Sequence, residues 1–377
     1  MTNHICALCD DLITAKNDSN EHVLPNSIGG FKTVNGFICD PCNKKSGDKW
    51  ESALARQLNP LSVFFSIKRD RKNPPPTRVQ SKSGKSYDLH HDGKLTLAEH
   101  SYSTISNELG VDINIEAKTT KQAKQLIQRA KSEYPSIDIE PLLEQVSMIR
   151  TYDDDPIDIN LSIGGHDVGR SIVKSALSLA VEAGVSHLSC EHAISYLKNP
   201  DNGACYGFYY IKDIIVNRPT SVPLHCVYVI GKPETRQILG YVELFGIYKM
   251  VLSLSSSYKG DHFENMYAIN PMTGKQLQLD CKLELSPQDI EDAYNYKAYT
   301  VEKHIEAVNK VIPTGQQKAF ENELARVIEQ AYEQVKNNWI VKEGEEPTLE
   351  QLAEFKDLVQ KIVTPFIEHH TKRSKPL

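Results

Sequence analysis

The chain has 377 residues, a length that favours two or three domains. Its composition, 40% hydrophobic and 24% charged, is that of an ordinary soluble protein and excludes an intrinsically disordered chain. The sequence contains no run of about 18 apolar residues, so we expect no membrane-spanning helix. The opening MTNHICALCDD lacks the basic and apolar regions of a secretory signal, and we expect a cytoplasmic protein.

The net charge of −6 argues against a protein that coats nucleic acid along its whole length. The charge is unevenly distributed, however. Residues 1–78 hold 11 Lys and Arg against 8 Asp and Glu, so the rest of the chain carries the acidic excess. This pattern indicates a small basic module attached to a larger acidic body.

Four of the eight cysteines form two CxxC pairs near the start of the chain, Cys6 with Cys9 and Cys39 with Cys42. In a reducing compartment, such pairs are more typical of a zinc site than of disulfides. Four thiolates complete a tetrahedral shell, which indicates structural rather than catalytic Zn2+. Because 30 positions separate Cys9 from Cys39, we expect a folded element between the two zinc knuckles.

A helix is predicted directly after the second knuckle. Trp50, Leu54 and Leu58 recur at helical spacing, with Asp40 as the expected N-cap and Pro41 at the first helical position. Gly47 falls inside this helix or marks a break in it. The prolines at 74–76 indicate a boundary or a stiff connector.

The remaining elements alternate in type. Residues 86–98 predict a hairpin that turns at Asp92 and Gly93, 111–117 a strand, and 120–134 a basic amphipathic helix. Residues 156–185 predict a strand, a glycine turn and a long helix, and 190–197 another helix. The β-rich segments of 206–256 are joined by short turns and predict an antiparallel sheet. Four helical segments follow at 286–296, 300–312, 315–339 and 348–370.

These elements predict an α+β fold with four parts. They are a small finger domain at residues 1–73, a linker at 74–85, an α+β recognition or regulatory domain at 86–285, and a helical region at 286–377. The glycine turn SIGGHDVGR (162–170) has two interpretations, a tight packing turn or a phosphate-binding loop. It lacks the lysine and Ser/Thr of a P-loop and the full dinucleotide pattern, so the packing turn is favoured.

The segment between the knuckles, EHVLPNSIGG, contains residues that are typical of catalysis. With its neighbours it resembles the HNH endonucleases, also called ββα-metal or His-Me finger nucleases, in the subtype held by two CxxC knuckles. The resemblance covers roughly residues 4–58 and leaves the C-terminal region unrecognised. The matching residues are Cys6, Cys9, Glu21, His22, Pro25, Gly29, Gly30, Asn35, Cys39, Cys42, Asn43 and Gly47.

The resemblance implies a role for each polar residue of the finger. His22 would be the general base that activates water, and Asn35 would orient it. Glu21 and Asn43 would hold a divalent ion that binds the scissile phosphate. An imidazole with its usual pKa near 6.5 suits proton transfer at neutral pH, and carboxylate and amide oxygens suit hard cations.

Two departures from the family pattern bear on the metal. The acidic ligand is Glu rather than the commoner Asp, and no histidine follows Asn43 on the helix. The ion would then have few protein ligands and keep several waters, which favours Mg2+ or Mn2+.

Basic residues in the second half of the finger domain suggest contacts to backbone phosphates. The alternative is a solvated helix face joined to a basic linker. The residues concerned are Lys44, Lys45, Lys68, Arg69, Arg71 and Lys72.

We therefore predict a metal-dependent endonuclease that cleaves DNA. Its architecture resembles bacterial restriction or anti-phage effectors, with a C-terminal region that recognises the target, forms a homodimer, or responds to a ligand or protein partner. Two alternatives stay open: a zinc ribbon that binds nucleic acid or protein without catalysis, and an HNH enzyme that cleaves RNA.

Overall fold

The computed structural model describes residues 4–108, 110–147, 151–152, 155–338, 341 and 346–373. The chain forms two compact units, and each unit takes two separate segments. The first unit is Met1–Pro75 with Leu161–Lys318, and the second is Pro76–Asn160 with Ala319–Leu377. The domain boundaries given above stay a prediction. Within the described part of the chain, no helix is both long and apolar enough to cross a membrane.

The first unit begins with two short hairpins. Strand β1 (His4–Ile5) pairs with β2 (Leu12–Ile13), and β3 (Glu21–His22) pairs with β4 (Thr33–Val34), both antiparallel. A 3-10 turn, Asn26–Ile28, follows β3. An isolated bridge between Asp18 and Cys39 holds the chain just before β3 against the start of the helix that follows.

That helix is continuous from Asp40 to Phe64 but changes its winding at Gly47. It consists of α1 (Asp40–Ser46), a π-helical turn (Gly47–Glu51) and α2 (Ser52–Phe64). The predicted N-cap is wrong by one residue: Cys39 is the N-cap and Asp40 is already in the first turn, with Pro41 at the start. The extended backbone of Cys39 places its sulfur in the second knuckle and also begins the helix. Because the helix runs through Gly47 as a π-helical turn, this glycine lies inside the helix and does not end it.

The predicted antiparallel sheet is confirmed and has six strands, in the order β11-β14-β13-β12-β15-β16. Alternate side chains of each strand point to opposite faces, and both faces are covered by apolar side chains. The strands are β11 (Tyr206–Phe208), β12 (His225–Lys232), β13 (Gln237–Leu244), β14 (Tyr248–Ser255), β15 (Phe263–Asn270) and β16 (Lys275–Gln276).

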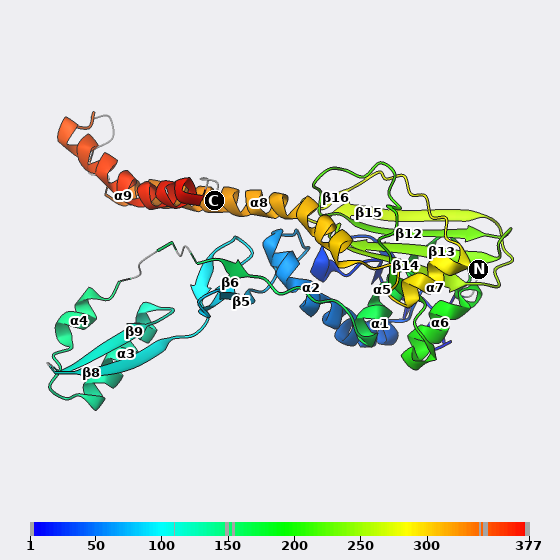
Figure 1. Ribbon diagram of the computed structural model, residues 1–377, viewed down its shortest axis with the longest axis horizontal. Helices are drawn as coiled ribbons and strands as arrows, with labels where there is room; N and C mark the ends of the chain where they lie inside the picture. Colours follow the sequence, from blue (N-terminus) through cyan, green and yellow to red (C-terminus); the bar gives the residue numbers. More distant parts are fainter. Residues whose placement is uncertain are drawn as a thin grey trace. The chain divides into compact units, whose positions relative to one another are not determined.

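The finger does not have a core of its own. Its apolar residues belong to one cluster with helix α5 (His166–Glu182) and one face of the sheet, including Leu54, Val173 and Val227. Helices α6 (Glu191–Lys198) and α7 (Pro287–Tyr294) lie near the sheet (Figure 1). The finger is therefore an integral part of the first unit. The apolar surface that it buries is supplied by α5 and the sheet, which lie more than 100 positions later in the sequence.

The second unit contains a four-stranded sheet, a separate hairpin and helices. The predicted hairpin at 86–98 is confirmed as β6 (Ser86–Leu89) and β7 (Leu95–Leu97), in a sheet with β5 (Thr77–Ser81) and β10 (Ile157–Asp158). Strands β8 (Ser101–Asn107) and β9 (Gly110–Glu116) form the second hairpin. The helices are α3 (Thr120–Glu133), α4 (Glu140–Gln145) and α9 (Leu349–Arg373).

The two helical segments predicted on either side of Pro313 form one helix, α8 (Val301–Asn337). A proline interrupts the helical hydrogen bonds, but tertiary contacts hold the chain in a helix on both sides of it. Val311 is buried, Thr314 donates a hydrogen bond to the Ser221 carbonyl, and Gly315 lies against the Phe64 ring. Among the described residues of the C-terminal region, the four predicted helices are thus three, α7, α8 and α9.

Candidate active site and metal centre

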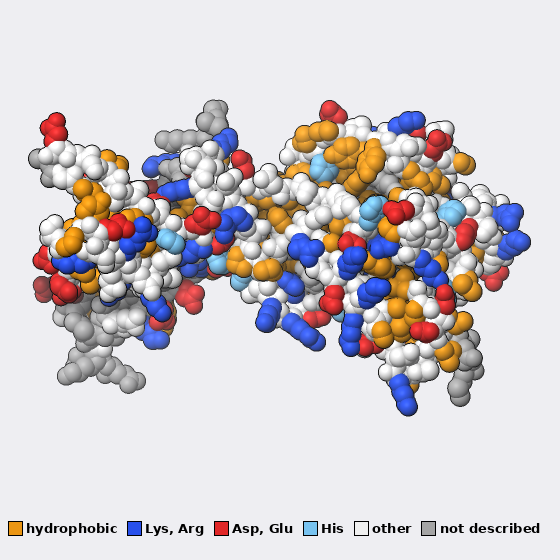
Figure 2. All heavy atoms as spheres, turned by 90° about the horizontal axis from the view of Figure 1, so that it is seen from below, with side chains coloured by type: hydrophobic (Ala, Val, Ile, Leu, Met, Phe, Trp, Pro, Cys, Tyr) orange, Lys and Arg blue, Asp and Glu red, His pale blue; other side chains and the backbone are white. Residues whose placement is uncertain are grey.

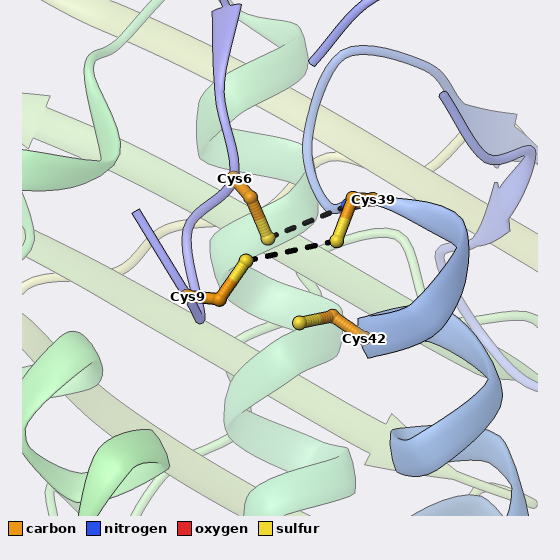
Figure 3. A group of neighbouring side chains, drawn as sticks. All are labelled: Cys6, Cys9, Cys39 and Cys42. Carbon is orange, nitrogen blue, oxygen red and sulfur yellow. Dashed lines mark hydrogen bonds between the residues drawn. The ribbon is translucent and has the colours of Figure 1, made fainter. Parts of the chain in front are cut away.

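The four cysteines of the CxxC pairs converge on one point (Figure 3). Cys6 and Cys9 come from the first hairpin, and Cys39 and Cys42 from the start of α1. The Cys9 and Cys39 sulfurs are 3.7 Å apart, and all four sulfurs lie within 4.8 Å of one another. Tetrahedral zinc with Zn–S bonds of about 2.3 Å requires S–S distances of about 3.8 Å. The residues therefore fit Zn2+ as predicted.

The Glu-His pair lies on strand β3, whose register is fixed by its pairing with β4. Glu21 pairs with Val34 and His22 with Thr33. At the next position of the ladder, Asn35 donates a side-chain hydrogen bond to the Asn20 side chain, with 2.8 Å between Nδ2 and Oδ1. Asn35 thus fastens the end of the hairpin that carries His22.

The paired glycines after His22 are required by the turn. Gly29 has a φ of +93°, which residues with a Cβ rarely adopt. A Cβ at Gly30 would lie 1.9 Å from the Leu24 carbonyl oxygen. His225, fully buried on β12, donates from Nε2 to the Ile28 carbonyl at 2.8 Å and accepts the Phe245 N–H at Nδ1. The turn is therefore fixed to the sheet as well as to the strand.

His22 is half-buried, and burial lowers its pKa. The carboxylates of Glu51 and Asp70 oppose this shift, and the Lys174 ammonium adds to it. The neutral imidazole is consequently the favoured form near pH 7, and this is the form that accepts a proton.

Glu21 is completely buried and forms an ion pair with Lys174 of α5. Each of the two side chains is 1% exposed, so this is a dry pair. The Lys174 ammonium also binds the Glu51 carboxylate and lies 3.3 Å from the Ser46 hydroxyl. Burial raises the pKa of Glu21, and the Lys174 ammonium acts in the opposite direction. Lys174 thus joins the strand of the Glu-His pair to the helix that carries Asn43.

Two further contacts hold α5 against the finger helix. The Arg170 guanidinium lies over the Trp50 ring, 5.1 Å from its centre, one turn before Lys174. The Gln57 side chain accepts the Gly164 N–H at 2.8 Å and donates to its carbonyl at 3.0 Å. The glycine turn at 162–170 therefore serves packing, the interpretation that the sequence favoured.

Asn43 lies on α1, half-buried, three residues before Ser46. That spacing places Asn43 and Ser46 on one face of the helix, and Ser46 faces the Lys174 cluster.

Sequence reasoning missed Glu51 and Lys174. Glu51 follows Asn43 by eight residues, close to two helical turns, and this spacing was a usable signal. Lys174 stands alone in the apolar run SIVKSALSLAV, and a single charge in such a run indicates a buried partner. The sequence did not indicate which partner.

The predicted phosphate-binding residues lie in two places. Lys44 is exposed and paired with Asp40, and Lys45 is exposed on the same helix. Lys68, Arg71 and Lys72 are exposed, and Arg69 is half-buried.

Their loop is fastened beside the Glu-His segment. The Asn26 side chain donates to the Asp70 carboxylate at 3.0 Å and accepts the Asp70 N–H at 3.2 Å. On the face drawn in Figure 2, Lys and Arg are interspersed with Asp and Glu, so charge alone marks no nucleic-acid surface.

The four-cysteine cluster, the two short hairpins and the helix make residues 4–64 a small finger whose cysteines fit a zinc ion. Residues 6–59 match the family model for an HNH endonuclease. This part of the chain is an HNH endonuclease domain, and the rest matches no family model. No curated protein and no solved structure matches the chain. The domain supports nuclease activity of the HNH type and a nucleic-acid substrate.

Proposed function

We propose that the protein is a divalent-metal-dependent endonuclease that hydrolyses phosphodiester bonds in DNA. The observation that carries the proposal is the junction at Lys174. There a buried ammonium joins the strand bearing the Glu-His pair to the helix bearing Asn43. A zinc ribbon that only binds a partner needs no such junction, whereas a nuclease needs both elements at one place.

In this proposal His22 takes a proton from the attacking water. Its half-buried position keeps the imidazole neutral, and its strand is held by the Asn20–Asn35 hydrogen bond and by the glycine turn. Asn35 therefore acts through the hairpin, as a positioning residue. Such fixed placement of a base contributes to the rate because the reacting groups lose little freedom on reaction.

We propose that the carboxylate of Glu21 and the side-chain carbonyl of Asn43 hold the Mg2+ or Mn2+ ion; the Glu51 carboxylate shares the Lys174 ammonium with Glu21. These are hard oxygen donors, which fit either ion. When bound, the ion would supply charge neutralisation of the phosphate and of the leaving oxygen. Lys174 keeps the buried carboxylate of Glu21 and the partly exposed carboxylate of Glu51 close together, where their mutual repulsion would otherwise separate them.

The finer parts of the proposal concern substrate and setting. We propose DNA phosphate contacts from Lys44, Lys45 and the basic loop Lys68–Lys72, and control or targeting by residues outside the finger. A single site cuts one strand, so cleavage of both strands would use a homodimer. A cytoplasmic location accords with zinc-bound rather than disulfide-bonded CxxC pairs. A role in bacterial restriction or anti-phage defence rests on the family resemblance alone.

The test uses purified full-length protein, supercoiled plasmid, and Mg2+ or Mn2+. The wild type is expected to give nicked or linear product that a chelator abolishes. His22→Ala is expected to give none, whereas the matched control His262→Ala, an exposed histidine far along the chain, is expected to cleave normally. Equal cleavage by His22→Ala would contradict the assignment of the base. Single-stranded RNA in parallel distinguishes an RNase from a DNase.

A further inference from the structure

A hollow in the first unit has no part in the proposed chemistry. It measures about 510 Å³ and lies between the loop that follows β11 and the first turns of α8. None of its lining residues belongs to the candidate active site. Pockets of this size accommodate small molecules larger than a single phosphate ion.

The lining is basic in an acidic chain. Five basic residues face the hollow, against Asp213 and Glu306 as the acidic ones: Lys212, Arg218, Lys249, Lys303 and Lys310. Lys249 lies 3.5 Å from Asp213, and Lys310 pairs with Glu306 at 2.6 Å.

Arg218 has a structural role in the wall of this hollow. It binds Asp213 and, through two parallel hydrogen bonds of 2.7 and 2.8 Å, the fully buried carboxylate of Glu243. The Tyr241 hydroxyl donates a third hydrogen bond to Glu243. A buried carboxylate held in this way fixes Arg218, so the wall is formed before any ligand arrives.

Lys212 and Lys303 differ from the other basic residues. Lys212 donates to the Glu284 carbonyl at 2.7 Å and Lys303 to the Ile211 carbonyl at 2.9 Å. Neither forms an ion pair with a carboxylate in the part of the chain that the structure describes. A backbone carbonyl satisfies the hydrogen bond but does not neutralise the charge. Lys212 and Lys303 both line the hollow and are exposed, so their ammonium groups are accessible to an anion that enters it.

The other wall is apolar. Tyr210, Ala307 and Val311 are buried and line the hollow. We propose that the hollow binds a phosphorylated small molecule of about nucleotide size. Its phosphates would lie on Lys212 and Lys303, and its organic part against Tyr210 and the apolar side chains of α8. Lysine ammonium groups bind phosphate as point charges.

Occupancy would act first on α8, because Lys303, Ala307, Lys310 and Val311 all lie on its first turns. The same helix continues to Asn337 and supplies residues to the second unit. A ligand bound here would stabilise those turns, which offers a physical route for the control proposed above.

The test is calorimetric titration of the zinc-loaded full-length protein with ATP and, separately, with pyrophosphate, in the absence of Mg2+ and Mn2+. Nuclease activity does not enter the measurement. Wild type is expected to bind ATP more tightly than pyrophosphate. The double variant Lys212→Gln/Lys303→Gln should bind ATP at least about 100-fold more weakly, since each charge-assisted contact contributes roughly tenfold or more. Glutamine retains a donor for the carbonyls, so the loop and helix are expected to fold.

Lys297→Gln is the matched control, because Lys297 is an exposed lysine of the same unit that does not line the hollow. It should bind like the wild type. Amide hydrogen exchange gives a second measurement: ATP should slow exchange in residues 301–313 and 210–222. No saturable binding, unchanged affinity in the double variant, or equal affinity for pyrophosphate and ATP would overturn the proposal. Displacement of ATP by a short DNA duplex would also overturn it, and would assign the surface to nucleic acid.

Discussion

Replacing Lys174 with methionine tests the central junction of the finger. Methionine retains most of the apolar stem but removes the ammonium that binds Glu21 and Glu51. Glu51 is 20% exposed and keeps access to water, whereas Glu21 is 1% exposed and loses its charged partner. The loss of stability therefore arises mainly from the Glu21 carboxylate, which stays buried without an opposite charge.

The size of the effect follows from burial. Breaking a buried ion pair by removing one partner costs about 3–5 kcal/mol. Lys198 provides the matched control, since it pairs with Asp10 at 2.7 Å while their side chains are 40% and 59% exposed. An exposed pair contributes about 0–1 kcal/mol. Lys174→Met should thus destabilise the protein by about 3 kcal/mol more than Lys198→Met.

Urea unfolding of both variants and the wild type, followed by tryptophan fluorescence, measures this difference. Trp50 is a suitable reporter because it lies next to Glu51 and is buried. Thermal unfolding should show the same order, with a fall in Tm of roughly 10 °C for Lys174→Met, given about 2–4 °C per kcal/mol in a unit of this size.

The reasoning is refuted if Lys174→Met costs no more than Lys198→Met. A double variant separates charge from packing. Glu21→Gln/Lys174→Met leaves no unpaired buried charge, so it should recover most of the lost stability. Failure to recover would show that Lys174 stabilises the finger through its stem, and that the ion pair adds little.

Three other variants test the zinc ligands of the finger, the buried histidine that holds its turn, and the Glu51 carboxylate. Cys39→Ser should reduce bound zinc from about one ion per chain to nearly none by metal analysis, since it removes one of four ligands. Burial lowers the pKa of His225 from 6.5 to about 4, so the unfolded state takes up a proton first as the pH falls through this range. The free energy of unfolding of the wild type should therefore fall by about 3 kcal/mol between pH 6.5 and pH 4. His225→Gln should show a smaller fall over the same range. Glu51→Gln should lower plasmid cleavage by about tenfold or more with little change in Tm, because its carboxylate lies beside the site but is partly solvated.

Each of these has a clear contrary outcome. Full zinc content in Cys39→Ser would mean that the ion is held elsewhere. For His225→Gln, the contrary outcome is a difference in the free energy of unfolding from the wild type that stays constant from pH 7 to pH 4. It would show that His225 has the same pKa in the folded and unfolded states. Normal cleavage by Glu51→Gln would exclude its carboxylate from the site.

The local features of the finger could be read from the sequence. The CxxC pairs, the Glu-His pair and the double glycine are short-range patterns, each imposed by local chemistry: four sulfurs for one metal, and a turn that tolerates no Cβ. The antiparallel arrangement of β12, β13 and β14 was predictable for a similar reason, since consecutive β-rich segments joined by short turns pair with their neighbours. The pairing of β11 with β14 and of β15 with β12 joins strands that are not consecutive, and the sequence did not indicate it.

The continuity of the helices was less predictable. Pro313 breaks a helix by its local preference, but Val311, Thr314 and Gly315 make tertiary contacts on both sides of it. Local preference also placed the N-cap at Asp40, whereas the zinc knuckle sets the backbone at Cys39 and makes that residue the cap.

The sequence by itself determined the zinc knuckles, the Glu-His pair and the class of the N-terminal domain, because each depends on residues close together in the chain. Only the tertiary structure showed that Lys174, more than 120 positions after Glu51, meets both carboxylates of the finger. A charge buried in an apolar helix must find an opposite charge, but the sequence does not say where the helix will pack. The packing of α5 on the finger makes that choice, because it buries the apolar surface that the finger cannot cover by itself.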